Sequence, residues 1–118
     1  MELRDEKLDD AITKAVAIGR WDVGGAMEIE LRLSVLAGSG RSLVIDMSEV
    51  SFLSSMGIRS IVMSAKAVAL RGARLVLVSP TEHVAAVLVA TGIDTVVPIC
   101  HDLQVACAIA RAGSDPAA

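Results

Sequence analysis

Two short, almost entirely apolar runs constrain the fold more than any other feature of the 118-residue chain. They are "SLVIDM" at 42–47 and "ARLVLVSP" at 73–80, and each is typical of a strand buried on both faces of a sheet. Between the two runs, apolar residues recur at the spacing of one helix face: Ile58, Ile61, Val62, Ala65 and Ala69. A strand, a helix and a second strand in this order predict a parallel pair joined by a right-handed crossover.

The segments that follow extend this alternation. "TEHVAAVLVATG" at 81–92 has an N-cap candidate in Thr81 and ends on Gly92, so we expect a helix there. "TVVPIC" at 95–100 predicts a short last strand, placed at an edge by Pro98, and "HDLQVACAIARAG" at 101–113 predicts a final helix. The fold class is therefore α/β, a single domain with a mixed sheet of four or five strands flanked by helices.

The pattern before residue 42 is less regular. Residues 11–23 are compatible with two short strands kinked at Gly19, and residues 24–40 favour a helix that ends at the "GSG" of 38–40. The first ten residues hold five acids and two bases, which suits either a loose arm or a frayed first strand. We therefore predict a charged N-terminal arm at 1–10, the domain proper at 11–112 and a flexible tail at 113–118.

Composition argues against several classes of function. Aromatic residues make up only 2% of the chain, which argues against a stacking platform for RNA or single-stranded DNA. The net charge of −3, without a basic run, argues against binding to duplex DNA, so we expect no nucleic-acid partner. The longest apolar run, "VAAVLVA" at 84–90, is far shorter than the ~20 residues of a membrane span. Because the N-terminus is charged and has no apolar signal core, we expect a soluble, cytoplasmic protein without membrane insertion.

The sequence contains none of the common catalytic motifs. The patterns GxxxxGK[ST], GxGxxG and GxSxG are all absent. His83 and His101 each begin a predicted helix without an acid or cysteine at ligand spacing, so we expect them to be solvated or capping residues. Cys100 and Cys107 are seven residues apart, which is not a metal or redox spacing, so we expect buried, reduced thiols. These observations predict a protein that is not an enzyme and has no cofactor or metal.

Four serines gather just before the predicted central helix, in "MSEVSFLSSMG" at 47–57. We expect Ser48 and Ser51 to serve the turn out of the preceding strand. Ser55 is placed to cap a helix that starts at Met56, where its oxygen would accept a free backbone N–H, with Ser54 beside it.

Two interpretations of this serine loop stay open on the residues alone. Ser54 and Ser55 are either only loop and cap residues, or one of them is a phosphorylation site that switches the binding of a partner. Arg59 follows Ser55 by four residues and would lie within reach of a phosphate there. Gly57 would allow another chain to approach the first turn of the helix closely.

The stretch "LVIDMSEVSFLSSMGIRSIV" resembles the signature of the STAS domain, in which a strand ending "hDhs" is followed by "xVxFhDSxG" and a helix. The matching positions are Leu43 to Asp46, Ser48, Val50, Phe52, Ser54, Ser55 and Gly57. "GRWD" at 19–22, "GARLVLVSP" and "VLVATGIDTVVPI" are similar to further motifs of the family. The resemblance covers roughly residues 12–110.

This resemblance implies a small binding protein, an anti-sigma factor antagonist. Family members of this size bind an anti-sigma factor that is also a serine kinase, which phosphorylates a serine at the start of the signature helix, and a phosphatase restores the hydroxyl. By position the phosphorylated residue would be Ser55, with Ser54 as the alternative. The resemblance also implies a set of partner-binding residues: Asp22, Asp46, Ser54, Ser55, Met56, Gly57 and Arg59.

The chain departs from the commonest family pattern at one position. Ser54 stands where most members have an aspartate, and Met56 follows the candidate phosphoserine and presents a flexible apolar surface. This departure motivates an alternative function, a constitutive STAS-type binding subunit of a transporter or signalling scaffold that is not phosphorylated.

Overall fold

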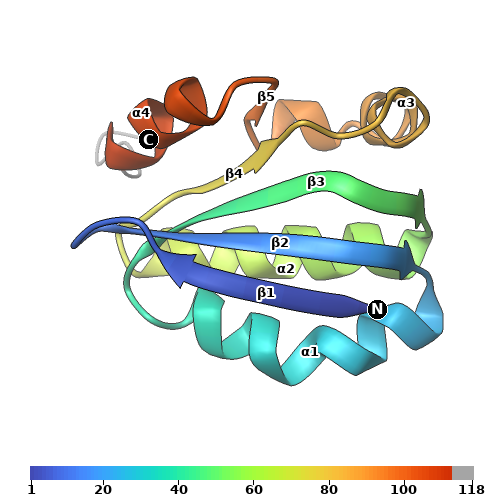
Figure 1. Cartoon of the computed structure of the whole chain (residues 1–118), viewed down its shortest axis with the longest axis horizontal. Coiled ribbons are helices and arrows are strands. Elements are labelled where there is room, and N and C mark those ends of the chain that lie inside the picture. Colours follow the sequence, from blue (N-terminus) through green and yellow to red (C-terminus); the bar gives the residue numbers. More distant parts are fainter. Residues whose placement is uncertain (113–118) are drawn as a thin grey trace.

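The computed structural model describes residues 1–112, so the tail predicted at 113–118 lies outside the described residues. Figure 1 shows strands and helices that largely alternate along the chain. They are β1 (Glu2–Lys7), β2 (Ile12–Trp21), α1 (Val23–Ala37), β3 (Ser42–Leu53), α2 (Ser55–Leu70), β4 (Leu75–Val78), α3 (Glu82–Ala90), the 3₁₀ helix η1 (Ile93–Thr95), β5 (Ile99–Cys100) and α4 (Leu103–Ala112).

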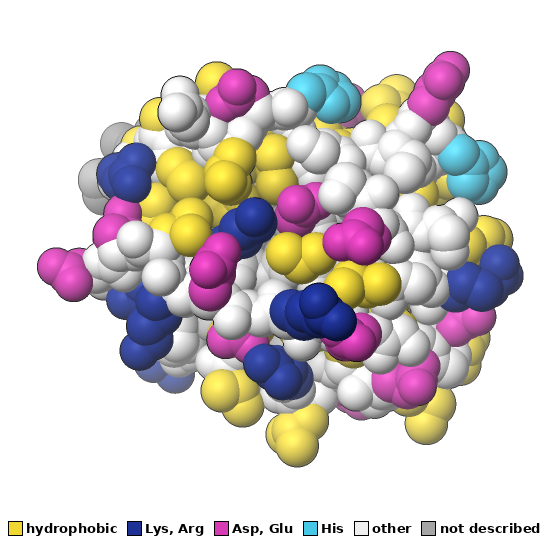
Figure 2. Space-filling model, viewed as in Figure 1, with side chains coloured by type: hydrophobic (Ala, Val, Ile, Leu, Met, Phe, Trp, Pro, Cys, Tyr) yellow, Lys and Arg dark blue, Asp and Glu magenta, His cyan; other side chains and the backbone are white. Residues whose placement is uncertain are grey.

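The strands form one mixed sheet of five strands, as the sequence predicts, and their order in it is β1-β2-β3-β4-β5. β1 is antiparallel to β2 and the other pairs are parallel. Of the two possibilities for the first ten residues, the structure contains the strand, with Leu3 buried and the rest of β1 exposed. Acidic and basic side chains are interspersed over the face that Figure 2 shows. A charged edge strand of this kind discourages pairing with other chains.

β2 is one strand, so the prediction of two short strands at 11–23 is wrong. Its pairing with β3 shifts register between Val16 and Ile18 and again between Gly19 and Arg20. Gly19 adopts φ +111°, a conformation that non-glycine residues rarely reach. The irregularity that the sequence suggested at Gly19 is therefore a bulge inside a continuous strand.

Two apolar clusters lie on opposite faces of the sheet. The larger one packs α1, α2 and α3 against the strands, with residues such as Ile29, Ile61 and Leu88 in its centre. The smaller one lies under α4 and contains Cys100 and Cys107, which are buried free thiols as predicted. Figure 1 shows α2 and α4 on opposite sides of β4.

The helices predicted after residue 42 are confirmed, with one adjustment in α2. Thr81 caps α3 by accepting a hydrogen bond from the Val84 amide. In α2 the buried residues are Gly57, Ile61, Ser64 and Val68. Of the predicted stripe only Ile61 is among them; Ile58, Val62 and Ala65 are half-buried, and Ala69 is exposed. The stripe is rotated because α2 also packs against α1, and not against the sheet alone.

Candidate functional site

The start of α2 is organised by Ser54, not by Ser55. Ser54 has extended backbone angles, and its Oγ accepts a hydrogen bond of 3.3 Å from the Gly57 amide, so it is the N-cap. Its backbone N–H and its hydroxyl both donate to the Trp21 carbonyl at 2.9 Å. These contacts tie Ser54 to the end of β2, and Ser55 becomes the first residue of the helix. The prediction of Ser55 as the cap is therefore wrong by one residue.

Ser55 is exposed, and its side chain does not contribute to capping the helix. Among residues 1–112 its hydroxyl makes no hydrogen bond, in contrast to that of Ser54, which both donates and accepts. An exposed hydroxyl at the first position of a helix is accessible for modification, and the helix N-terminus favours negative charge there.

Ser48 and Ser51 lie inside β3, which runs on to Leu53, so the predicted turn is not formed there. Both side chains are exposed, whereas Val50 and Leu53 are buried against the core. The Ser48 amide donates to Asp46 Oδ1 at 2.9 Å. The polar residues that suggested a loop therefore form the solvent side of a strand with an irregular register.

Gly57 seats the first turn of α2 directly on Trp21. A side-chain carbon at Gly57 would lie 2.9 Å from both Cγ and the carbonyl oxygen of Trp21 and 2.7 Å from Leu53 Cδ1. The close approach that the glycine predicted is present, but the approaching segment belongs to this chain and is not a partner. Sequence reasoning noted Trp21 only within "GRWD" and missed its role as the support of the site.

Asp22 and Arg20 lie at the same end of the sheet, because Asp22 follows the tryptophan that holds Ser54. Asp22 caps α1, and its Oδ1 accepts a hydrogen bond of 2.8 Å from Gly25. Arg20 lies 3.5 Å from Asp22 and stacks over the Phe52 ring at 4.4 Å. Neither α1 nor α2 has an acidic residue in its first turn. Two adjacent helix N-termini and Arg20 favour an anion here, while the carboxylate of Asp22 opposes one.

Asp46 is not brought to this site. It pairs with Val16 of β2, five residues before Trp21, which corresponds to roughly 16 Å along the strand. Met56, Gly57 and Arg59 all belong to the first turns of α2. The structure thus gathers six of the seven predicted partner-binding residues at or near the start of α2 and separates Asp46 from them.

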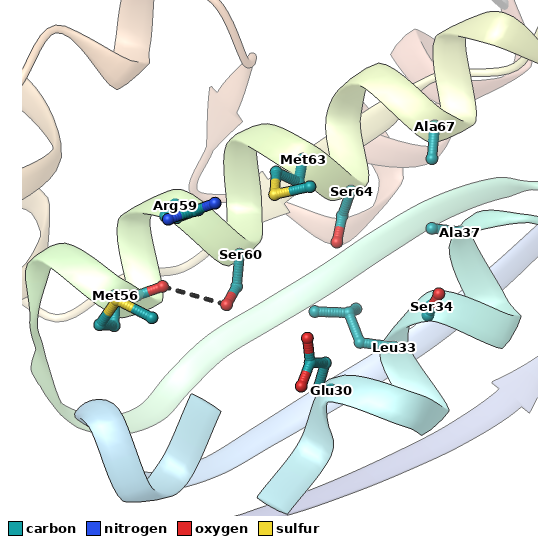
Figure 3. A pocket seen from close by; sticks show the side chains of 10 residues that line it. All are labelled: Glu30, Leu33, Ser34, Ala37, Met56, Arg59, Ser60, Met63, Ser64 and Ala67. Carbon is teal, nitrogen blue, oxygen red and sulfur yellow. Dashed lines mark hydrogen bonds between the residues drawn. The ribbon is translucent and has the colours of Figure 1, made fainter. Parts of the chain in front are cut away.

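A groove of about 490 Å³ begins beside this site and runs between α1 and α2. Figure 3 shows side chains from both helices along it. Its lining residues are Glu30, Leu33, Ser34, Ala37, Met56, Arg59, Ser60, Met63, Ser64 and Ala67. Nowhere in residues 1–112 is a group of three His, Cys, Asp or Glu side chains placed to hold a metal ion. In the same range no helix has the length and apolar character needed to cross a membrane.

The model of the STAS domain family matches residues 6–106. The chain belongs to the STAS domain family. Comparison with curated proteins gives no significant match.

The fold of this STAS domain is similar to that of several solved structures. One is an anti-sigma factor antagonist from Mycobacterium paratuberculosis, with a TM-score of 0.83 and 22% identity over 93% of each chain. An anti-sigma factor antagonist domain protein from Planctomyces limnophilus gives a TM-score of 0.77 and 20% identity, covering 92% of this chain and 97% of that one. The phosphorylated form of the Bacillus cell fate determinant SpoIIAA gives a TM-score of 0.69 and 14% identity, covering 92% and 99%. At these identities the likeness establishes the fold.

Asp22 predicts a pH dependence of stability in this STAS domain. The hydrogen bond from the Gly25 amide, with Arg20 beside it, holds the pKa of Asp22 below its usual value. A carboxylate with a lowered pKa in the folded state stabilises the fold above its unfolded pKa, and this stabilisation is lost as the pH falls through the folded value. Asn is an equally good N-cap but carries no charge, so Asp22→Asn removes only this dependence.

We expect the wild type to have a higher urea midpoint than Asp22→Asn at about pH 6, and this difference in midpoint to shrink as the pH falls below the usual pKa of an aspartate. Urea unfolding followed by circular dichroism over this range measures it. A difference that stays constant down to the acid end would contradict the prediction.

Proposed function

We propose that this STAS domain is an anti-sigma factor antagonist that acts by binding, not by catalysis, in the cytoplasm. It binds an anti-sigma factor that is also a serine kinase, and phosphorylation of Ser55 weakens the complex until a phosphatase removes the phosphate. The observation that carries the proposal is that two adjacent serines differ in their hydrogen bonding. Ser54 caps α2 and holds it to β2, which leaves the Ser55 hydroxyl exposed and unbonded among the described residues.

The surroundings of Ser55 suit a phosphate. A phosphoserine adds about −1.5 to −2 charges, which the N-terminus of a helix stabilises. α2 has no acidic residue in its first turn, and Arg59 lies four residues beyond Ser55, within reach along the helix surface. The domain is therefore expected to stay folded when phosphorylated, while its docking surface changes charge.

Ser54 is the less suitable acceptor. Its half-buried hydroxyl donates to the Trp21 carbonyl, and a phosphate ester would lose that donor and place its charge against a carbonyl oxygen. The proposal is further supported by solved structures of similar fold, which include anti-sigma factor antagonists and both the unphosphorylated and phosphorylated forms of SpoIIAA.

A phosphorylation assay tests the proposal. We expect the cognate anti-sigma kinase and ATP to add one phosphate to the wild type and none to Ser55→Ala, as measured by intact mass. Ser54→Ala is the matched control, and we expect it to be labelled at Ser55 because its acceptor hydroxyl remains. Labelling of Ser55→Ala at the wild-type rate would sink the assignment.

A constitutive STAS-type binding subunit of a transporter or scaffold is the second candidate. It is favoured by Met56, an exposed apolar side chain next to Ser55, and by Ser54 at the usual aspartate position. Calorimetry with the purified partner distinguishes the two functions. The switch predicts that Ser55→Asp raises Kd about tenfold or more, whereas an unchanged Kd supports the constitutive subunit.

A further inference from the structure

We propose that the groove between α1 and α2 is a second docking surface for the same partner and that it receives an amphipathic helix of that partner. The occupying helix carries apolar residues along one side, an acidic residue opposite Arg59 and a basic residue opposite Glu30. This inference rests on the proposed function, because it takes the occupant from the anti-sigma factor. Figure 3 shows Arg59 on α2 and Glu30 on α1, on opposite walls of the groove.

The size and lining of the groove suit a helix. From Met56 to Ala67, α2 contributes eleven steps of about 1.5 Å, so the groove is roughly 16 Å long, which corresponds to three turns of a docked helix. Half of the lining is aliphatic or thioether side chains, among them Leu33 and Met63, and the other half is three serines and two charged residues. Methionine adapts its shape to a partner at low cost. These are the features of a groove that binds an apolar helix face.

Two of the apolar side chains that line the groove stay exposed. Met56 and Met63 are seven residues apart on α2 and are 37% and 58% exposed. Further exposed apolar residues of the same two helices, Leu70 on α2 and Met27 and Leu31 on α1, lie outside the lining of the groove. Exposed apolar side chains along a groove are typical of an interaction site.

The charges beside the groove favour a partner helix as its occupant. Neighbouring charges on α1 are already paired, since Glu28 binds the N-terminal ammonium of Met1 and Arg32 binds Asp5. Glu30 and Arg59 take part in none of the ion pairs of residues 1–112. Two unpaired charges of opposite sign, on opposite walls, can each pair with a residue of a helix that lies between them. A second copy fits less well, because symmetric pairing would set groove against groove and leave both unfilled.

Arg59 links this groove to the phosphorylation site. Arg59 lines the groove. It also follows Ser55 by four residues in α2, so the two side chains lie on the same face of the helix. A phosphate on Ser55 would draw the guanidinium towards itself and away from an acidic residue of the docked helix. Phosphorylation is therefore expected to weaken docking along the groove as well as at the helix start.

A charge introduced into the groove tests the docking surface. We expect Met63→Glu to raise the Kd for the purified anti-sigma factor at least tenfold in calorimetry. The matched control is Val105→Glu, an exposed apolar residue of α4 on the other face of the sheet, for which we expect a change within twofold. Circular dichroism and thermal unfolding verify that both variants are folded.

The outcomes separate the two proposals. A wild-type Kd for folded Met63→Glu overturns the groove and leaves the antagonist function standing. If the wild type binds no anti-sigma factor, the proposed function falls, and the groove proposal falls with it. If ultracentrifugation shows that the wild type is a dimer that Met63→Glu dissociates, the occupant is a second copy and the proposal is overturned.

A double-mutant cycle tests the role of Arg59. We expect Ser55→Asp to raise Kd by a smaller factor in an Arg59→Gln background than in the wild type, because the aspartate then has no arginine to withdraw from the partner. If the fold-changes in Kd caused by Ser55→Asp and by Arg59→Gln simply multiply in the double variant, the link between the groove and the phosphorylation site is overturned.

Discussion

Replacing Trp21 by alanine is expected to lower the free energy of unfolding by about 3–5 kcal/mol, the usual cost of removing a large buried aromatic side chain. Trp21 is fully buried and belongs to the larger cluster beneath α1, α2 and α3. A domain of this kind has a total stability of about 5–15 kcal/mol, so the variant loses a large share of it. Urea unfolding measures the loss, followed by far-ultraviolet circular dichroism because the variant has no tryptophan.

Trp21→Phe is the matched control. The phenyl ring keeps most of the buried area. The indole Nε1 has no hydrogen-bond partner among the described residues, so removing it leaves no other polar group without a partner. We expect a loss of about 1–2 kcal/mol, well below that of the alanine variant. Equal losses for the two variants would show that a phenyl ring does not replace the indole in the packing under Gly57.

The strands that could be predicted from sequence are those buried on both faces. "SLVIDM" and "LVLV" form consecutive apolar runs because α2 and α4 cover the sheet from both sides at β3 and β4. The second half of β3 could not be predicted in this way. There Ser48, Glu49 and Ser51 face solvent, and bulges in the pairing with β2 break the alternation that would have indicated a strand.

The location of the site could be predicted, but its internal arrangement could not. Local preference for serine at an N-cap applies equally to Ser54 and Ser55. The choice between them is made by a contact across the fold, the hydrogen bonds of Ser54 to the Trp21 carbonyl, 33 positions earlier in the chain. The groove was missed for the same reason. Periodicity identifies the faces of a helix, but it does not show that Leu33 and Met63 line the same groove.

The adjacent glycines at the start of α1 are expected to respond in opposite directions to the same substitution. A side-chain carbon at Gly25 would overlap the carbonyl oxygen of Arg20, which is strand backbone, and would also lie 3.2 Å from Met1 Cβ. The backbone of β2 cannot move aside without disturbing the pairing that leads into Trp21 and Asp22. We therefore expect Gly25→Ala to cost about 3 kcal/mol of unfolding free energy, at the upper end for overpacking of a buried position.

Gly24→Ala provides the control within the same turn. The nearest atom to a side-chain carbon there is Asp22 Oδ1 at 3.7 Å, an ordinary contact, and the position is exposed. Alanine restricts the unfolded chain and favours the helix, so we expect a gain of about 0.5 kcal/mol in urea unfolding. A lower free energy of unfolding for Gly24→Ala would mean that the first turn of α1 has no room for a side chain even at its exposed position. A neutral Gly25→Ala would mean that α1 does not lie as close to β2 as the Arg20 carbonyl requires, and the support of Asp22 and Trp21 at the site would then need another explanation.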